Sequence, residues 1–331
     1  MEPTRVGLIG CGGMGRSLGR QLITLDSTRL VGVADVASEA ADRASGELGA
    51  PAYTDVDAFL SDVKLDAVII ATPGFQHRPL AEAAAARGLQ IFVEKPMAPT
   101  VADCDAMSRA AEAAGVTLMV GQVLRYYPCW WQILELVRSG AIGDPWGVTI
   151  TRMGGGWDGW PHAWRNSLAM SGGLLMEVNA HEIDFMTQVA GEVTEVYAVA
   201  NHFNDDGCDY PSLYFVSLKF ASGAVGLLHS STVATVPDLS GKVQGSQGTI
   251  VYTDGFGAGE IRWSRRNEEV QTIKVADIRV ENPLRKELRL FFEAIRGTGS
   301  VPIPPDEGRR NVAVAEAAYE SARSGQVIRL S

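Results

Sequence analysis

The chain has 331 residues and a formal net charge of −10 at pH 7, and 46% of its residues are hydrophobic. This length favours two domains over one. The acidic balance and the lack of a basic stretch argue against a nucleic-acid partner. No apolar run is long enough to span a bilayer, and residues 1–4 do not resemble the start of a signal peptide, so we expect no membrane association and a cytoplasmic setting. The four cysteines are Cys11, Cys104, Cys129 and Cys208. They are far apart and lack any metal-binding or disulfide spacing, so we expect no metal site and no disulfide framework.

Strand and helix patterns alternate over the first third of the chain. An apolar strand over 6–9 leads into a glycine-rich turn and a helix over 16–25. The strands predicted after it are 30–34, 65–71, 89–93 and 116–120, and the helices are 38–49, 56–62, 76–87 and 100–114. Strands that alternate with helices predict a parallel sheet covered on both faces. We therefore expect an α/β fold whose N-terminal domain, residues 1–122, is a Rossmann doubly wound parallel sheet.

The pattern changes after residue 122. We predict a helix over 130–138, a strand over 145–153, a Gly- and Trp-rich loop over 152–173 and one helix over 174–189. Consecutive strands with short turns then predict an antiparallel sheet: 193–202, 213–220, 224–233, 249–253 and 261–264. Helices over 284–296 and 306–322 and a strand over 327–330 end the chain. Residues 123–331 are thus expected to form an α+β domain with a mostly antiparallel sheet, with the C-terminal helix free to pack back on the first domain.

The predicted strand over 213–220 does not alternate cleanly between apolar and polar residues. Leu213, Phe215 and Leu218 do not keep to one face of the strand. We therefore expect both faces of this sheet to be covered, one by the domain's own helices and the other by a partner subunit.

The glycine turn has the G-x-G-x-x-G pattern of dinucleotide-binding proteins. Gly10 permits the tight turn, Gly12 lets the backbone approach a pyrophosphate, and Gly15 lets the helix pack close to the strand. The pyrophosphate would bind the free N–H groups of the helix N-terminus. Asp35 ends the second strand about twenty residues later, where a carboxylate accepts hydrogen bonds from a ribose. No Arg or Lys follows before Arg43, which favours NAD over NADP; the alternative is a tight turn and a solvated Asp that bind nothing.

Three polar segments follow strand ends, where ligands of open α/β sheets bind. They are Thr72-Pro73 with His77 just beyond, Glu94-Lys95-Pro96, and Gly121-Gln122. Lys95 is the most informative of these residues, because a lysine at the lip of a parallel sheet is costly to desolvate unless it meets polar partners. The alternative is an ordinary surface lysine in a loop.

A second candidate cluster lies on the helix predicted over 174–189. Glu177, His181 and Asp184 are spaced i, i+4 and i+7 and would share one helix face. Flanking carboxylates can fix the tautomer of a histidine and tune its pKa for proton transfer. The alternative is a structural histidine on a polar face.

The loop before this helix carries residues that suit a sugar. Trp157, Trp160 and Trp164 lie among glycines, with Asp158, His162 and Arg165 nearby. Aromatic faces pack on the C–H faces of sugars, and polar side chains bind their hydroxyls. Packing between domains or subunits is the alternative for the tryptophans.

Together these motifs resemble the glucose–fructose oxidoreductase / inositol dehydrogenase / rhizopine-catabolism family (Gfo/Idh/MocA) over nearly the whole chain. The resemblance rests on the turn 10–15, Asp35, residues 71–73 with His77, Glu94-Lys95-Pro96, residues 121–125, and the run from Gly172 through His181 to Asp184. It implies a Rossmann domain and an α/β domain whose large open antiparallel sheet packs in homodimers or homotetramers. It also implies hydride transfer between a nicotinamide and a carbinol of a sugar, inositol or related polyol.

The resemblance implies roles for single residues. Lys95 would hydrogen-bond the reacting hydroxyl, and His181 would take its proton, with Glu177 as a third catalytic residue. Glu177 stands where inositol dehydrogenases usually have Asp, so the carboxylate is kept but is one methylene longer. Leu124 stands where they tend to carry a basic residue, and this departure weakens the case for inositol. The implied cofactor-binding residues are Gly10, Gly12, Gly13, Met14, Gly15, Asp35, Ala71, Thr72, Pro73, His77, Glu94, Lys95 and Gln122. The implied substrate-binding residues are Lys95, Arg125, Trp157, Trp164, Arg165, Glu177 and His181.

The sequence thus predicts an NAD-dependent oxidoreductase, with NADP less favoured. Two alternatives share the fold: a glycoside-processing enzyme that retains NAD and oxidises its substrate transiently, and a non-catalytic NAD-binding regulator. The regulator would keep the glycine turn but lose Lys95 or His181, and both residues are present.

Overall fold

The computed structural model describes residues 2–154, 163–202, 207–256 and 259–330. The chain forms two compact units: Met1–Val123 with Glu281–Arg309, and Leu124–Val280 with Arg310–Ser331. The segment 281–309 differs from the expectation, because it belongs to the first unit and not to the second.

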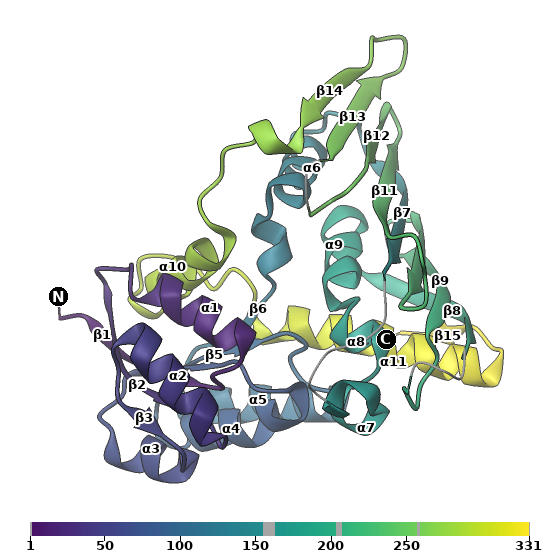
Figure 1. Ribbon diagram of the computed structural model, residues 1–331. Coiled ribbons are helices and arrows are strands. Elements are labelled where there is room, and N and C mark those ends of the chain that lie inside the picture. Colours follow the sequence, from purple (N-terminus) through teal and green to yellow (C-terminus); the bar gives the residue numbers. More distant parts are fainter. Residues whose placement is uncertain (1, 155–162, 203–206, 257–258, 331) are drawn as a thin grey trace. The chain divides into compact units, whose positions relative to one another are not determined.

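The first unit contains a six-stranded parallel sheet in the order β3-β2-β1-β4-β5-β6 (Figure 1). The strands are β1 (Thr4–Ile9), β2 (Thr28–Ala34), β3 (Ala52–Tyr53), β4 (Ala67–Ile70), β5 (Gln90–Glu94) and β6 (Leu118–Gly121). All four residues of β4 are buried, as a strand covered on both faces requires. This strand order reverses between β1 and β4, where doubly wound sheets bind their ligands. The predicted Rossmann fold is confirmed.

Helices cover both faces of this sheet, as right-handed crossovers require. Its helices are α1 (Gly13–Leu22), α2 (Ser38–Leu48), α3 (Val56–Asp62), α4 (His77–Ala85), α5 (Val101–Ala114) and α10 (Pro283–Ile295). Helix α1 packs against α2 and α10, while α4 packs against α5. Local sequence sets the helix ends: the Thr100 side chain caps α5 by accepting the Asp103 N–H, and Gly115 ends it in the left-handed conformation.

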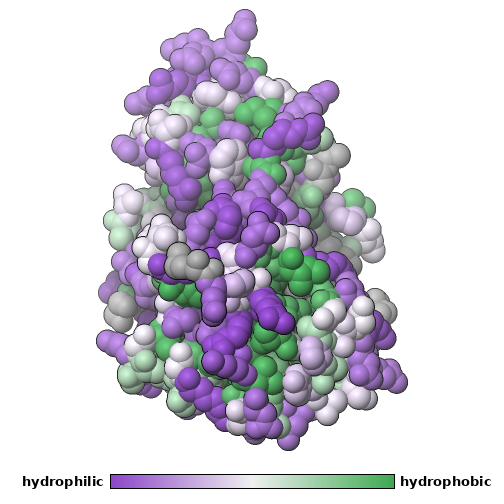
Figure 2. Space-filling view, turned by 90° about the vertical axis from the view of Figure 1, so that its left-hand side faces the viewer, coloured by the Kyte–Doolittle hydropathy of each residue, from purple (hydrophilic) through white to green (hydrophobic). Residues whose placement is uncertain are grey.

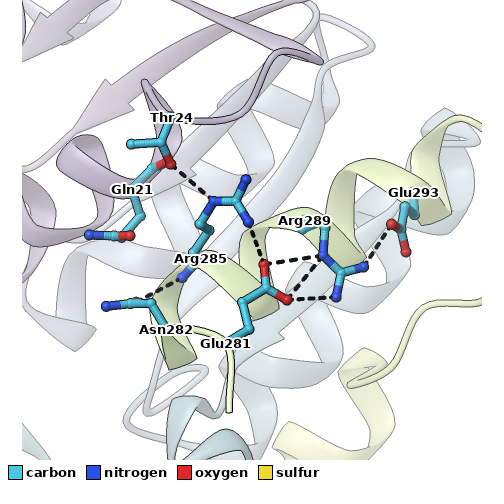
Figure 3. A network of polar contacts seen from close by, with 7 residues as sticks. All are labelled: Gln21, Thr24, Glu281, Asn282, Arg285, Arg289 and Glu293. Carbon is cyan, nitrogen blue, oxygen red and sulfur yellow. Dashed lines mark hydrogen bonds and ion pairs between the residues drawn. The ribbon is translucent and has the colours of Figure 1, made fainter. Parts of the chain in front are cut away.

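Helix α10 explains why the late segment joins the first unit. Leu288, Phe291 and Phe292 are buried, and each such side chain contributes about 1.5–3 kcal/mol on burial. The polar face adds a network (Figure 3): Arg285 donates to Thr24 at 3.2 Å and to Glu281 at 2.7 Å, and Arg289 binds Glu281 and Glu293. These ion pairs are partly exposed and individually weak, so the apolar face holds the helix.

The second unit contains a nine-stranded sheet in the order β14-β13-β12-β11-β7-β10-β9-β8-β15. Its strands are β7 (Pro145–Met153), β8 (Val193–Asn201), β9 (Leu213–Phe220), β10 (Val225–Ser231), β11 (Asp238–Gly245), β12 (Gly248–Tyr252), β13 (Glu260–Arg265), β14 (Gln271–Lys274) and β15 (Ile328–Arg329). Among the described strands of this second sheet, only β7 and β10 pair in parallel. The expected large, mostly antiparallel sheet is confirmed, although β11 and β14 were not among the predicted strands.

Strand β9 alternates between the two faces of this sheet more cleanly than its sequence suggests. Tyr214, Val216, Leu218 and Phe220 are buried, and Phe215 points to the other, exposed face. Figure 1 shows α6 (Pro128–Arg138) and α9 (Ala180–Ala190) on one side of the sheet, and α11 (Pro305–Ser324) contributes Tyr319, which packs on Tyr214. The inner face is therefore covered by the unit's own helices.

The helix predicted over 174–189 is two helices. The two helices are α8 (Leu174–Glu177) and α9, and residues 178–179 separate them. A 3₁₀ turn (Ala163–Asn166) and the short helix α7 (Leu168–Ser171) precede α8. At the break, the buried Asn179 side chain donates to Glu182 at 3.1 Å and accepts from Ser230 at 2.6 Å. These contacts hold Asn179 outside the helical ladder, so Glu177 does not share one continuous helix face with His181 and Asp184.

In the described ranges, no helix is both long and apolar enough to cross a bilayer. Figure 2 shows a hydrophobic strip (green) in the lower half of one face, between hydrophilic residues (purple). Apolar surface interspersed in this way is ordinary for folded proteins.

Candidate active site

The glycine turn of the first unit leaves space where a pyrophosphate would bind. Gly10 has φ +93°, and a Cβ there would lie 2.6 Å from the Ala71 carbonyl carbon. A Cβ on Gly15 would lie 1.8 Å from the Gly10 oxygen, so this residue lets α1 pack against the turn. Gly12 and Gly13 are exposed, and a Cβ on either would meet nothing within 4 Å. The turn is thus closed on its inner side and open on its outer side.

The N-terminus of α1 fits an anion. Gly12 is its N-cap residue and makes no side-chain cap hydrogen bond. The first N–H groups of a helix are left without intrahelical partners and carry a partial positive charge. An anionic pyrophosphate is the natural ligand for such a helix end when glycines let it approach, so these residues fit the NAD cofactor predicted from the sequence.

Asp35 lies beside this turn. Its Oδ2 accepts the Cys11 N–H at 2.8 Å, and its Oδ1 accepts the Ala37 N–H at 2.9 Å. These bonds fix the carboxylate at the carboxyl end of β2 and leave further lone pairs on its two oxygens. Cys11 itself is unreactive, because burial and the neighbouring Asp35 charge raise the pKa of its thiol to about 12.

His77 ties together the turns that follow β4 and β5. Its Nδ1 lies 2.9 Å from the Pro96 carbonyl oxygen, and its Nε2 lies 2.8 Å from the Thr72 carbonyl oxygen. The ring has no exposed surface. These two contacts join His77 to the backbone of both predicted cofactor turns.

Lys95 follows β5 and is half-buried. Its backbone N–H donates to Oε2 of Glu94 at 3.2 Å. The neighbouring strand β6 ends beside it at Gly121, which pairs with Glu94, and Gln122 next in the chain is buried. The structure therefore brings Ala71, Thr72, Pro73, Glu94, Lys95 and Gln122 to the same sheet edge as the turn 10–15, with Met14 exposed on it.

In the second unit, His181 lies at the start of α9 and is half-buried. Glu177, at the end of α8, accepts a hydrogen bond from Nε of Arg165 at 3.1 Å. The Arg165 guanidinium also lies 4.3 Å above the Trp164 ring, and its carbonyl accepts the Tyr210 hydroxyl at 2.7 Å. Glu177, Trp164 and Arg165 thus form one cluster, while Trp157 lies outside the described residues.

The Tyr319 side chain caps the N-terminus of helix α8. The Tyr319 hydroxyl accepts the Leu175 N–H at 2.8 Å and the Met176 N–H at 3.3 Å. A Cβ on Gly173, whose φ is +80°, would lie 2.8 Å from this hydroxyl. Burial raises the pKa of Tyr319 well above its usual range, so the hydroxyl stays neutral and fixes the helix that carries Glu177.

Asp184 pairs with Arg125, a contact the sequence pattern missed. Arg125 donates from Nε and Nη2 to the two Asp184 oxygens at 2.6 and 2.5 Å, and Asn311 donates to Oδ1 at 2.9 Å. All three residues are buried. This bidentate pair links residues 59 apart in the chain, and a role for Arg125 in substrate binding stays a prediction.

A second buried polar network surrounds the start of α9. Glu182 accepts from Arg152 at 3.2 Å and from Asn179, which in turn binds Ser230. Glu182 and Asn179 have no exposed surface. The only sequence signal for it is the three-residue spacing of Asn179 and Glu182 around the helix start. Within the described residues, His, Cys, Asp and Glu form no cluster able to hold a metal.

Two family models match the chain. The model for the oxidoreductase family with an NAD-binding Rossmann fold (GFO_IDH_MocA) matches residues 4–122, and the model for the GFO/IDH/MocA C-terminal domain matches residues 130–251. The chain belongs to the Gfo/Idh/MocA family. It is therefore an NAD(P)-dependent oxidoreductase, as predicted, and its first unit is an NAD-binding domain.

Several relatives cover the whole length of this Gfo/Idh/MocA chain. D-apiose dehydrogenase of Paraburkholderia graminis is 28% identical over 98% of this chain and 88% of its own. Myo-inositol 2-dehydrogenase of Thermotoga maritima is 26% identical over 98% of each chain. The structure of aldose–aldose oxidoreductase from Caulobacter crescentus, complexed with glycerol, matches with a TM-score of 0.89 and 26% identity over 99% of this chain and 100% of its own.

Proposed function

We propose that this protein transfers a hydride between NAD and a carbinol carbon of a sugar, an inositol or a related polyol. The observation that carries the proposal is the edge of the first sheet. There the open glycine turn, the fixed Asp35 carboxylate and Lys95 follow strands β1, β2 and β5. The names of the relatives, which act on apiose and myo-inositol, support this substrate class.

When bound, NAD supplies the acceptor for the hydride. In the oxidation direction the carbinol C–H and O–H bonds break and a C=O bond forms. His181 takes the hydroxyl proton as general base, the role that histidine fills most often in enzymes. The Lys95 ammonium hydrogen-bonds the same oxygen and stabilises negative charge that develops on it. In the reduction direction His181 returns the proton.

The cluster of Trp164, Arg165 and Glu177 supports a polyol substrate. The indole ring offers an apolar face for sugar C–H groups, and the Arg165–Glu177 pair offers donors and acceptors for hydroxyls. We propose that this cluster binds the substrate and that Glu177 orients His181 or the substrate beside it.

The two alternatives are not favoured. A silent regulator has no need of Lys95 and His181, and the relatives named above are dehydrogenases or oxidoreductases. An enzyme that retains NAD and oxidises its substrate only transiently would give no net reduction of the cofactor, so the experiment below distinguishes it.

The test follows NADH absorbance against a panel of inositols, aldoses and sugar acids. Some member of the panel should reduce NAD, and Lys95→Ala and His181→Ala should each lower kcat by at least about 100-fold. Lys64→Ala, which removes an exposed lysine before β4 in the same unit, is the matched control and should match the wild type. Turnover by Lys95→Ala at the wild-type rate would refute the assignment.

We also propose that a second copy of this chain covers the outer face of the nine-stranded sheet. Tyr197, Val199, Phe215 and Leu227 are each at least 38% exposed. Val199 pairs with Phe215, and both Tyr197 and Leu227 pair with Ser217, so the four side chains form one patch over β8, β9 and β10. Exposed apolar patches of this kind mark protein contacts. Phe215→Glu should lower the mass measured by light scattering, and an unchanged mass would refute this interface.

A further inference from the structure

Glu287 is a buried carboxyl group that none of the proposed steps uses. It lies on α10 of the first unit and has no exposed surface. Within the described residues, no N–H or hydroxyl donor reaches either of its oxygens. An ionised carboxylate in such surroundings is very unfavourable, so this group requires a proton or a partner of another kind.

The packing of α10 on β5 places Glu94 opposite Glu287. Phe291 lies one turn after Glu287 on the same helix face, and its ring packs edge-on against Phe92 with a centroid distance of 5.8 Å. Glu94 lies two residues after Phe92, so it points to the same face of β5. Glu94 is itself buried. The contact between the two phenylalanines therefore sets Glu94 and Glu287 at facing positions of β5 and α10.

Gly121 on the next strand supports this placement. It pairs with Glu94 in the sheet. A Cβ on Gly121 would lie 2.8 Å from the Phe92 ring and 3.3 Å from Oε1 of Glu94. The ring and the carboxylate thus lie on the same side of the sheet, over the space that the missing side chain leaves. This is the side on which Phe92 meets α10.

Glu94 is the charged residue whose electrostatic effect on Glu287 is largest. Burial, with the Glu94 charge adding to it, raises the pKa of Glu287 well above its usual range. Arginines on the elements packed around it bind other carboxylates: Arg285 and Arg289 bind Glu281 and Glu293 (Figure 3), and Arg16 and Arg20 bind Glu47.

We propose that Glu94 and Glu287 hold one proton between them, and that this bond makes Glu287 a positioning residue for Lys95. Glu287 donates the proton to Oε1 of Glu94, while Oε2 of Glu94 accepts the Lys95 backbone N–H at 3.2 Å. The pair carries one negative charge, and it fixes the turn from which the Lys95 side chain extends. This inference rests on the proposed function for its effect on catalysis, but not for the shared proton.

The shared proton is tested by infrared difference spectroscopy of the wild type against Glu287→Gln at pH 8. Glutamine keeps the shape and a donor but cannot carry the acid. The wild type should show the carbonyl band of a protonated carboxylic acid that the variant lacks. Absence of that band would overturn the proposal, whether or not any substrate is turned over. This result is therefore separate from a failure of the proposed function.

The positioning role is tested by kinetics of three variants on α10. Glu287→Gln should keep kcat within about threefold of the wild type, and Glu287→Leu should lower kcat by about tenfold or more at an unchanged KM for NAD. Glu293→Gln, which changes a partly exposed acid on the same helix, is the control. A Gln variant as impaired as the Leu variant, or a Leu variant with wild-type kcat, would overturn the role. If the Leu variant does not fold, the Gln variant and the infrared band still decide.

Discussion

Replacing Arg125 with methionine tests whether the Arg125–Asp184 pair is structural. The change removes the two hydrogen bonds from Arg125 to the Asp184 carboxylate, at 2.6 and 2.5 Å, and among the described residues it leaves the Asn311 bond at 2.9 Å. Hydrogen bonds to a charged group are worth about 1.5–3 kcal/mol each. The sum agrees with the roughly 3–5 kcal/mol lost when one partner of a buried ion pair is removed. Because Asp184 is only 2% exposed, water cannot replace the lost hydrogen bonds to its carboxylate.

The assay is urea unfolding of the wild type, Arg125→Met, Asp184→Leu and the double variant. The free energy of unfolding should fall by about 3–5 kcal/mol in each single variant. In the double variant it should fall by less than the sum of the two, because neither charge is then buried alone. Arg138→Met is the control, since this arginine is 54% exposed and its pair with Glu135 should contribute less than about 1 kcal/mol. A loss below about 1 kcal/mol for Arg125→Met, or full additivity in the double variant, would refute the reasoning.

Three further predictions concern the cofactor turn. Gly12→Ala should leave Tm unchanged, because the new Cβ has space, but it should weaken NAD binding at least about tenfold as measured by calorimetry. Gly15→Ala should lower Tm, because its Cβ would collide with the Gly10 oxygen. Asp35→Ser should reduce the ratio of kcat/KM for NAD over NADP by about tenfold or more; an unchanged ratio would remove Asp35 from the ribose contact. Cys11, with its pKa raised to about 12, should resist alkylation by iodoacetamide at pH 8 in the folded protein and react once urea unfolds it and returns the thiol to its ordinary pKa.

The first unit was predictable from sequence because its signals are local. The buried run of β4, the glycine turn before α1 and Asp35 after β2 lie within short windows, and each dictates its own backbone conformation. Asp35 is an example: it directly follows β2 in the sequence, and its carboxylate lies beside the glycine turn in the structure.

The second unit was predicted less well because long-range contacts decide its details. Asn179 ends one helix and precedes another because Ser230, 51 residues away, binds its side chain. Strand β11 is rich in glycine and polar residues and forms because β7 and β12 pair with it on either side. Periodicity alone could not show either contact.

Buried acids were the hardest feature to foresee. On α10, Glu287 is a charged residue at a position of the apolar face, one turn before Phe291, whereas a glutamate is ordinarily expected at the surface. Its burial depends on β5, about 190 residues earlier in the chain, where Glu94 and Phe92 set the surface that the helix covers.

The most direct test of the central claim is a single turnover with a substrate that carries deuterium at the carbinol carbon. Mass spectrometry of the reduced cofactor should find the deuterium on the nicotinamide ring. Lys95→Met should slow its appearance by at least about 100-fold at a saturating concentration of NAD. Reduced cofactor without deuterium, or transfer by Lys95→Met at the wild-type rate, would contradict hydride transfer assisted by this lysine.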